Sequence, residues 1–381
     1  MTKLINFTNI SPKNSKEAYL IKKHIDNVIS KKNFILGDDV KTFENKFSKL
    51  SNIKFAVGCA SGTDALSLAI KSLNLKQTHE IIVPAFTYIS TGLSVLLNNK
   101  KLVYADVDKE TGLISTESIL ENITKNTKVI IPVNLYGQKV DLKNLRKKVG
   151  NKIFIIEDSA QSHFAYSCYN CVNPKNKNCC KKERNDHHAD ISCYSFYPAK
   201  NLGAYGDAGL IATNNKKIYT RLMSLRNLGS IKKHKHQFVG LNSRLDTIQA
   251  AILNNKIKST LWSNDRRRFF AKIYDIKLSK IKEIIITKTK PGSARHLYVI
   301  RTKRRNSLMK HLIKKKINCQ IHYPYSLNKI SAFREIKSKN KNVKNSELWS
   351  NECLSLPLHP KLKIEDLNRV ISEINIFFKN K

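Results

Sequence analysis

The sequence predicts an α/β protein whose main domain holds a mostly parallel sheet with helices on both faces. Two observations predict this class. Over the first two-thirds of the chain, apolar segments of strand length alternate with segments that carry apolar residues at helical spacing, the pattern of parallel strands joined by crossover helices. From about residue 280 that alternation is lost, which predicts a smaller α+β domain. With 381 residues, the chain is long enough for two or three domains.

The elements of the first domain are predicted from short apolar patterns. We expect helices over residues 64–73, 91–97 and 246–258, and strands over residues 81–84, 102–105, 129–133 and 154–158, with a further strand from residue 192. In sheets of this kind, ligands bind beyond the carboxyl ends of the strands. Polar residues at these ends are therefore candidate site residues.

The second domain is predicted from strands over residues 283–287, 296–301 and 319–323 and helices over residues 307–316 and 366–378. We expect three parts: an N-terminal segment (1–30) that packs with the small domain, a large domain (31–258) and a small domain (259–381). A segment at about 165–188 is rich in Cys, Lys and Asn, which predicts an irregular insertion into the large domain.

The charge of the chain is strongly positive, with 69 Lys and Arg against 29 Asp and Glu, a net charge of +40. The lysines are spread over the whole sequence, which favours solvated surfaces over a nucleic-acid site. No segment has the 18 to 20 or so apolar residues that a membrane span needs, and no secretory signal pattern starts the chain. We therefore expect a cytoplasmic protein without a membrane or nucleic-acid partner.

The eight cysteines fall into two groups. Those in apolar or small-residue surroundings are expected to be reduced core residues: Cys59, Cys193, Cys319 and Cys353. The others cluster in the predicted insertion: Cys168, Cys171, Cys179 and Cys180. This cluster is either a reduced surface loop, which its unusual spacing favours, or a structural zinc site remote from the chemistry.

Two segments at a helix start and a strand end carry candidate site residues. Ser61, Gly62 and Thr63 precede the predicted helix at 64–73, where backbone N–H groups and a hydroxyl could bind a phosphate, although the same residues suit an ordinary N-cap. Asp158 ends an apolar strand, where a carboxylate is costly unless it is paired. It either holds a cationic group or caps a following helix.

Lys200 is the third candidate. It follows a predicted strand and a Pro-containing turn, and Gly203, Gly206 and Gly209 come soon after it. This setting predicts an enclosed lysine, and burial lowers the pKa of an amine and frees it to react with a carbonyl. A phosphate site, a buried carboxylate and a reactive amine are the groups that pyridoxal 5′-phosphate requires for its phosphate, its protonated pyridine nitrogen and its aldehyde.

The chain as a whole resembles the DegT/DnrJ/EryC1/StrS family of nucleotide-sugar aminotransferases. The similarity runs from about residue 34 to residue 357, and its landmarks are CASGTDAL (59–66), VPAFTYIST (83–91), ADVD (105–108), PVNLYGQ (132–138), IEDSAQSH (156–163), SFYPAKNLGAYGDAG (195–209), LRNLGS (225–230), GLNSRLDTIQAAIL (240–253) and HYP (322–324). The resemblance implies the aspartate aminotransferase type of fold (fold type I of pyridoxal-phosphate-dependent transferases), with a mostly parallel seven-stranded sheet.

The resemblance implies a role for each matching residue. Gly62, Thr63 and Ser195 would bind the cofactor phosphate, and Asn242 would reach in from the partner subunit, so that a homodimer with shared sites is implied.

Around the cofactor ring, Tyr88 would stack on one face, Asp158 would pair with the pyridine nitrogen and Gln161 would contact the 3-oxygen. Lys200 would hold the aldehyde carbon and carry the proton transfers. Relatives that have His at this position act as dehydratases, so Lys200 favours an aminotransferase.

The resemblance also implies a reaction: an amino group, with glutamate as the expected donor, is passed to a keto-deoxysugar linked to a nucleotide, in the biosynthesis of amino sugars for glycans. The segments at 225–230, 240–253 and 322–324 are most similar to members that act on dTDP-3-keto-6-deoxyhexoses. A 4-keto-6-deoxyhexose on UDP or dTDP is the alternative. An inactive, polyanion-binding relative is the rival of another class, suggested by the charge. Asn134 replaces the His usual in the family, and we expect it to alter substrate contacts without touching the cofactor.

Overall fold

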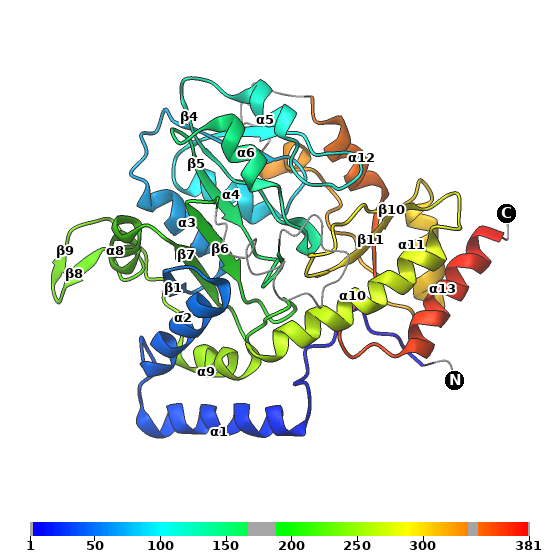
Figure 1. Ribbon diagram of the computed structural model, residues 1–381, viewed down its shortest axis with the longest axis horizontal. Coiled ribbons are helices and arrows are strands. Elements are labelled where there is room, and N and C mark those ends of the chain that lie inside the picture. Colours follow the sequence, from blue (N-terminus) through cyan, green and yellow to red (C-terminus); the bar gives the residue numbers. More distant parts are fainter. Residues whose placement is uncertain (1–2, 167–187, 334–341, 380–381) are drawn as a thin grey trace.

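The computed structural model describes residues 3–166, 188–333 and 342–379 (Figure 1). At its centre lies a seven-stranded sheet of order β1-β7-β6-β5-β4-β2-β3. Strands β2 to β6 pair in parallel, whereas β7 runs antiparallel to both β1 and β6. The predicted mostly parallel seven-stranded sheet is confirmed, with these strands: β1 (Phe55–Cys59), β2 (Glu80–Pro84), β3 (Lys101–Ala105), β4 (Thr127–Ile130), β5 (Phe154–Asp158), β6 (Ile191–Ser195) and β7 (Gly209–Thr213).

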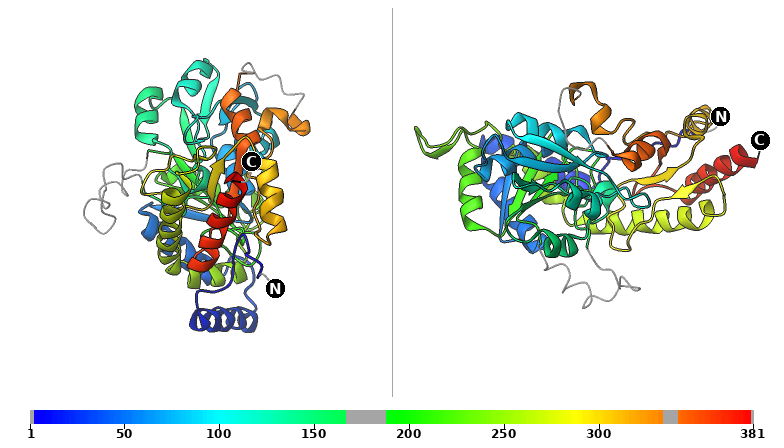
Figure 2. Two further views of the ribbon diagram at one scale, coloured as in Figure 1. Left: turned by 90° about the vertical axis from the view of Figure 1, so that its right-hand side faces the viewer. Right: turned by 90° about the horizontal axis from the view of Figure 1, so that it is seen from above.

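The sheet is buried on both faces because successive strand residues point to opposite sides. Ile81 and Val83 of β2 pack in one apolar cluster with α3, α4 and α8, and Ile82 between them packs in another with α5 and α6. At the β1–β7 end, α2 and α9 cover this second face. Figure 2 shows these helices from two further sides. Their bounds are α2 (Asp38–Ser51), α3 (Gly62–Ser72), α4 (Ile89–Leu97), α5 (Thr116–Asn122), α6 (Leu142–Val149), α8 (Lys216–Leu225) and α9 (Thr247–Lys256).

A second apolar core forms around the C-terminal part of the chain. The long helix α10 leads into it, and its antiparallel sheet has the order β10-β11-β12 (Figure 1). Ile5 lies in this core and pairs with Ile317, whereas α1 (Ser15–Lys31) packs against α9 of the first core. The elements are α10 (Ser259–Leu278), β10 (Ile285–Ile286), β11 (Tyr298–Arg301), α11 (Arg305–Lys314), α12 (Lys344–Glu352), β12 (Cys353–Leu356) and α13 (Ile364–Lys379). The domain boundaries at residues 30 and 258 stay a prediction.

One predicted strand is wrong. Residues 319–323 form only a single bridge, between Gln320 and Ser355, and the third strand of the small sheet is β12 instead. The carbonyl oxygen of His322 accepts a hydrogen bond from the hydroxyl of Tyr136 rather than from a neighbouring strand. The segment therefore turns away from the sheet, and His322 and Tyr323 line a cavity.

The remaining elements are short. The 3-10 helices are η1 (Leu135–Gly137), η2 (Leu327–Lys329) and η3 (Ser331–Phe333), and a hairpin of β8 (Ser230–Lys232) and β9 (Lys235–His236) projects from the body at the left of Figure 1. Among the residues that the structure describes, no helix combines the length and the apolar character needed to cross a bilayer. Cys59, Cys193, Cys319 and Cys353 are buried free thiols, as predicted.

Candidate active site

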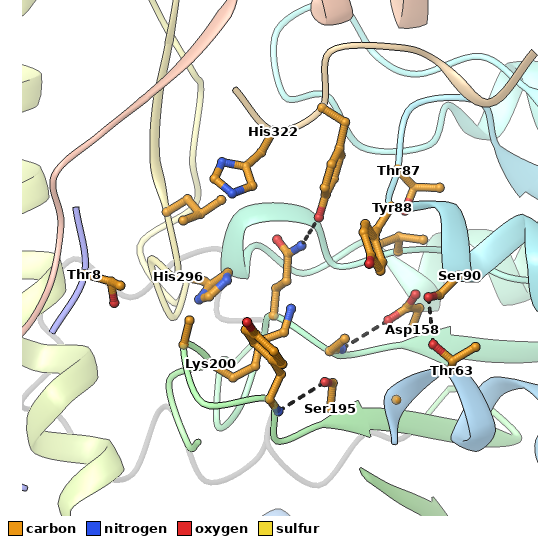
Figure 3. A pocket seen from close by; sticks show the side chains of 18 of the residues that line it. Thr8, Thr63, Thr87, Tyr88, Ser90, Asp158, Ser195, Lys200, His296 and His322 are labelled. Carbon is orange, nitrogen blue, oxygen red and sulfur yellow. Dashed lines mark hydrogen bonds between the residues drawn. The ribbon is translucent and has the colours of Figure 1, made fainter. Parts of the chain in front are cut away.

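A cavity of about 570 Å³ opens where β2, β4, β5 and β6 end (Figure 3). It collects the predicted site residues Gly62, Thr63, Tyr88, Asp158, Gln161, Ser195 and Lys200. Its other walls include Phe7, Thr8, Thr87, Ser90, Asp207, Arg267, His296, Gln320, His322, Tyr323 and Leu358. Residues far apart in the sequence therefore meet at the carboxyl ends of the parallel strands, where ligands of such sheets bind.

The start of α3 forms one wall of the cavity. Ser61 is the N-cap, and its Oγ accepts a hydrogen bond of 3.1 Å from the backbone N–H of Asp64. Gly62 lies so close to the end of β6 that a Cβ on it would stand 2.6 Å from the Cβ of Ser195. The hydroxyl of Thr63 is 2.7 Å from that of Ser90. The segment is thus both a helix cap and a polar wall of the cavity, and the positive end of the helix dipole favours an anion there.

Asp158 is a buried carboxylate on the floor of the cavity. Its Oδ2 accepts a hydrogen bond of 3.0 Å from the hydroxyl of Thr91, and its Oδ1 accepts one of 3.1 Å from the backbone N–H of Ala160. Burial raises the pKa of this carboxyl, against these two hydrogen bonds and the nearby amine of Lys200. The chain after Asp158 turns through residues 159–166 without entering a helix, so a helix-capping role does not describe it.

Lys200 reaches into the same cavity from the loop after β6 (Figure 3). Burial lowers the pKa of its amine from 10.5 to about 8, although the carboxylate of Asp158 acts in the opposite direction. The loop is tight, since a Cβ on Gly203 would lie 2.2 Å from the carbonyl oxygen of Pro198. Because the pKa is lowered, a larger fraction of the amine is neutral, and so nucleophilic, near pH 7 than for an ordinary lysine.

Gln161 has a fixed orientation beside Asp158. Its Oε1 accepts a hydrogen bond of 2.7 Å from the backbone N–H of Tyr136, and its Nε2 donates one of 2.8 Å to the hydroxyl of Tyr323. The ring of Tyr88, which is 54% exposed, lies 5.6 Å from the ring of Tyr323. The ring of Tyr88 therefore presents an aromatic face to the cavity, on which a planar ligand could stack.

Sequence reasoning missed the wall formed by Thr8, Arg267, His296 and His322. Burial is the main cause that lowers the pKa of His322 to about 4, and its Nδ1 lies 2.9 Å from the hydroxyl of Ser355. His322 could have been found from the sequence, because the HYP segment at 322–324 is one of the landmarks shared with the family. No local pattern distinguishes Arg267 or His296 from other residues of their helix and strand region.

Arg267 is the unusual member of this wall. It is buried, and its Nη1 donates hydrogen bonds of 2.7 Å and 3.2 Å to the carbonyl oxygens of Leu358 and His296. Burial lowers the pKa of its guanidinium to about 10. Within the described residues no carboxylate forms an ion pair with it. It also borders a smaller cavity of about 50 Å³ that adjoins Lys200. A buried cation without an anion is costly, so this arrangement suits an anionic group of a ligand.

Asn242 does not line the cavity of its own chain. It is exposed, and its backbone forms a bridge with Asn227. The next residue ties this segment to the cavity wall, because the hydroxyl of Ser243 donates a hydrogen bond of 2.7 Å to Asp64 and accepts one of 3.1 Å from the backbone N–H of Ala60.

Two further expectations concern residues outside this cavity. Asn134 does not line the cavity: it is fully buried and donates hydrogen bonds to Glu157 (2.7 Å), Ser159 (3.1 Å) and Ser162 (3.1 Å). It therefore braces β5 behind the cavity. An effect of this residue on substrate contacts stays a prediction. The candidate zinc ligands lie outside the described residues: Cys168, Cys171, Cys179 and Cys180. In the part of the chain that is described, no group of His, Cys, Asp or Glu is arranged to hold a metal.

The sheet, the small C-terminal domain and the cavity with Lys200 and Asp158 define a pyridoxal-phosphate-dependent aminotransferase of fold type I. The model of the DegT/DnrJ/EryC1/StrS aminotransferase family matches residues 16–375, and the chain belongs to this family.

Several relatives match over almost the whole chain. It is 36% identical to a dTDP-3-amino-3,6-dideoxy-alpha-D-galactopyranose transaminase of Aneurinibacillus thermoaerophilus, over 98% of this chain and 99% of the relative. It is 32% identical to a UDP-2-acetamido-2-deoxy-3-oxo-D-glucuronate aminotransferase of Pseudomonas aeruginosa, over 94% and 96%. Among solved structures, S. venezuelae DesV in complex with a ketimine intermediate superposes with a TM-score of 0.91 at 29% identity and covers 100% of both chains.

Proposed function

We propose that this aminotransferase moves an amino group from glutamate to the keto group of a nucleotide-linked deoxysugar, with a dTDP-3-keto-6-deoxyhexose as the acceptor. The observation that carries the proposal is the meeting of Lys200 and Asp158 in one cavity beside the start of α3. An amine of lowered pKa can react with the aldehyde of pyridoxal 5′-phosphate, and a buried carboxylate can pair with its pyridine nitrogen. The helix N-terminus can bind its phosphate.

The residues of the cavity fit this cofactor. Gly62 and Thr63, with Ser195 opposite, would hold the phosphate, because Gly62 exposes backbone where any side chain would meet Ser195. The carboxylate of Asp158 would accept a hydrogen bond from the protonated ring nitrogen.

The aromatic and amide groups fit as well. The exposed ring of Tyr88 would cover one face of the cofactor ring, and Gln161, whose amide is oriented by Tyr136 and Tyr323, would contact the 3-oxygen. When bound, the cofactor takes up the amino group and passes it on, and its cationic ring accepts electrons from the reacting carbon.

Lys200 supplies the acid–base chemistry. Because its pKa is lowered to about 8, its amine can take a proton from the α-carbon of the amino donor and return one during the second half of the reaction. Asp158 keeps its negative charge toward the ring nitrogen while Thr91 and Ala160 hold both its oxygens in place. Arg267 would bind the α-carboxylate of the amino-acid donor.

The acceptor sugar is inferred from the relatives. The Aneurinibacillus enzyme is named for a 3-amino sugar on dTDP and the Pseudomonas enzyme for a 3-oxo sugar on UDP. Both names support amination at carbon 3, and the higher identity of the first supports dTDP. A 4-keto-6-deoxyhexose on UDP or dTDP is the alternative acceptor.

A homodimer with shared sites completes the proposal. Asn242 is exposed and lies outside the cavity of its own chain, as expected of a residue that reaches the phosphate bound by the partner subunit. We place the enzyme in the cytoplasm.

The decisive experiment is a substrate panel. Purified protein should be yellow, and L-glutamate should convert it to a form that aminates a keto sugar nucleotide. We expect turnover with dTDP-3-keto-6-deoxyhexoses to exceed that with the 4-keto and UDP-linked compounds. Preference for a 4-keto sugar would overturn the acceptor assignment. Colourless protein that binds DNA tightly and in a salt-sensitive manner would support the polyanion-binding rival, which the joint presence of Lys200, Asp158 and Gln161 in one cavity disfavours.

A further inference from the structure

A row of hydrogen bonds leads from the protein interior to His296 in the cavity wall. The Nδ2 of Asn264 donates to the carbonyl oxygen of His163 at 2.9 Å. The Oδ1 of Asn264 accepts from the Nδ2 of Asn201 at 2.7 Å, and this Nδ2 also donates to the carbonyl oxygen of Ala294 at 2.8 Å. The Oδ1 of Asn201 then faces the Nδ1 of His296 at 2.9 Å.

The direction of every bond in this row follows from its first member. A backbone carbonyl can only accept, so Asn264 must present its amide nitrogen to His163 and its oxygen to Asn201. Asn201 must then use its nitrogen toward Asn264 and its oxygen toward His296. Because an amide oxygen cannot donate, the Nδ1 of His296 carries the hydrogen. If the ring is neutral, its Nε2 has a free lone pair.

The surroundings keep the ring neutral. His296 is only 8% exposed, and burial is the main cause that holds its pKa well below 6.5. The charged and titratable groups that face it come from several elements: Lys200 after β6, Arg267 on α10, His322 before β12 and His163 after β5. Lys200 and Arg267 are cations and oppose an additional positive charge on the ring, whereas burial lowers the pKa of His322 to about 4 and that of His163 to about 3, so both are neutral near pH 7. Near pH 7 the imidazole is therefore an acceptor at Nε2.

The ring lies at the cavity surface beside Lys200 (Figure 3). Since Nδ1 is occupied by Asn201, Nε2 is the ring nitrogen left for a ligand. A lone pair at this place repels carbonyl, carboxylate and phosphate oxygens and attracts a group that carries hydrogen. The amine of the amino-acid donor must reach the aldehyde carbon of the cofactor, to which Lys200 also binds, so this amine is not free to bond with His296. The hydroxyl groups of the sugar are then the hydrogen-bond donors available to His296.

We propose that the Nε2 of His296 accepts a hydrogen bond from a sugar hydroxyl next to the keto carbon, and so selects hydroxylated acceptors over their deoxy analogues. This inference rests on the proposed function, because it assigns part of the acceptor site. A site that hydrogen-bonds a hydroxyl rejects the analogue that lacks it strongly, since its own polar atom is then left without a partner.

The test compares His296→Leu with His296→Gln in the two half-reactions. For the hydroxylated keto sugar we expect His296→Leu to lower kcat/KM by about 10- to 100-fold, while His296→Gln, whose amide oxygen can accept, recovers part of the loss. With the deoxy analogue the wild type and His296→Leu should differ by less than about threefold. The donor half-reaction, followed as the colour change with L-glutamate, should fall far less than the sugar half-reaction.

A second variant tests the tautomer itself. Asn201→Leu removes the oxygen that holds the hydrogen on Nδ1, so Nε2 is no longer fixed as the acceptor and the sugar half-reaction should slow more than the glutamate half-reaction. Nitrogen NMR of the wild type should show Nδ1 protonated and Nε2 unprotonated. Protonated Nε2, an equal loss with the deoxy analogue, or a loss confined to the glutamate half-reaction would each overturn the proposal. A wild type that performs neither half-reaction would refute the proposed function instead.

Discussion

Gly62 and Ser195 come from different elements, yet a Cβ on Gly62 would stand 2.6 Å from the Cβ of Ser195. Real Cβ atoms do not approach so closely, so the start of α3 can lie against the end of β6 only with glycine at residue 62. This contact brings the first N–H groups of the helix and the hydroxyl of Ser195 to one wall of the cavity. The wall depends on the absence of one methyl group.

Gly62→Ala should therefore separate α3 from β6. We expect a loss of about 1–3 kcal/mol in the free energy of unfolding, as for other overpacked sites, and weaker retention of pyridoxal 5′-phosphate. Thermal unfolding and cofactor titration measure the two effects. The double variant Gly62→Ala/Ser195→Gly should regain stability, because the clashing Cβ is gone, but not cofactor affinity. Wild-type stability of Gly62→Ala would show that the helix shifts freely.

Lys200→Ala should abolish transamination while the fold and the oligomeric state persist, because the variant lacks both the amine for the cofactor and the proton carrier. Both half-reactions should be absent in single-turnover assays. Lys41→Ala, at an exposed position on α2, is the matched control and should behave as the wild type. Near-normal turnover by Lys200→Ala would contradict the assignment of the catalytic amine.

Asp158→Asn should retain the cofactor but slow catalysis by orders of magnitude, since a neutral amide does not keep the pyridine nitrogen protonated. Thr91→Val is the control: it removes one hydrogen bond to Asp158 and leaves the charge, so its effect should be much smaller. A loss below about tenfold for Asp158→Asn, or about 1.4 kcal/mol, would make Asp158 a structural residue.

The pH dependence of cofactor uptake tests the environment of Lys200. Its pKa is lowered to about 8, so half of the amine is neutral near pH 8 and nearly all of it above about pH 9. The rate at which apoprotein takes up pyridoxal 5′-phosphate should follow this fraction and level off above about pH 9. A rate that keeps rising towards pH 10.5 would indicate an unperturbed, solvated lysine.

Asn242→Ala should weaken cofactor retention, and mixing it with Lys200→Ala should restore activity if Asn242 acts across a dimer interface. Each mixed dimer then holds one intact site and one doubly altered site. Random exchange of subunits should give about a quarter of wild-type activity. Mixtures that stay inactive while forming dimers would place Asn242 outside the partner's site.

Much of this site was accessible from the sequence because its residues follow strands and open helices. Gly62, Asp158 and Lys200 each stand in a local pattern with its own chemistry, and the parallel sheet brings such strand ends together. The strand β5 was predictable from its apolar residues, and the two carboxylates that follow them mark the point where the strand ends.

Other features depend on contacts that no local pattern encodes. Residues 319–323 have the alternation of a strand, but the hydrogen bond from Tyr136 to His322 holds them over the cavity. The tautomer of His296 is set by Asn201, which lies 95 residues away in the sequence, and Asn201 is oriented in turn by Asn264, a further contact across 63 residues. Asn134 was expected to alter substrate contacts, but its hydrogen bonds to Glu157 and two serines hold it outside the cavity wall.

The cavity takes its walls from both ends of the chain, since Phe7 and Thr8 meet Leu358 there. During synthesis on the ribosome, the large sheet is complete at residue 213, long before Leu358 and His322 leave the exit tunnel. The nascent chain can therefore build its sheet early but has no closed cavity until translation is almost finished. Loading of the cofactor is expected to be a post-translational event, and products of premature termination should fold in part yet stay colourless.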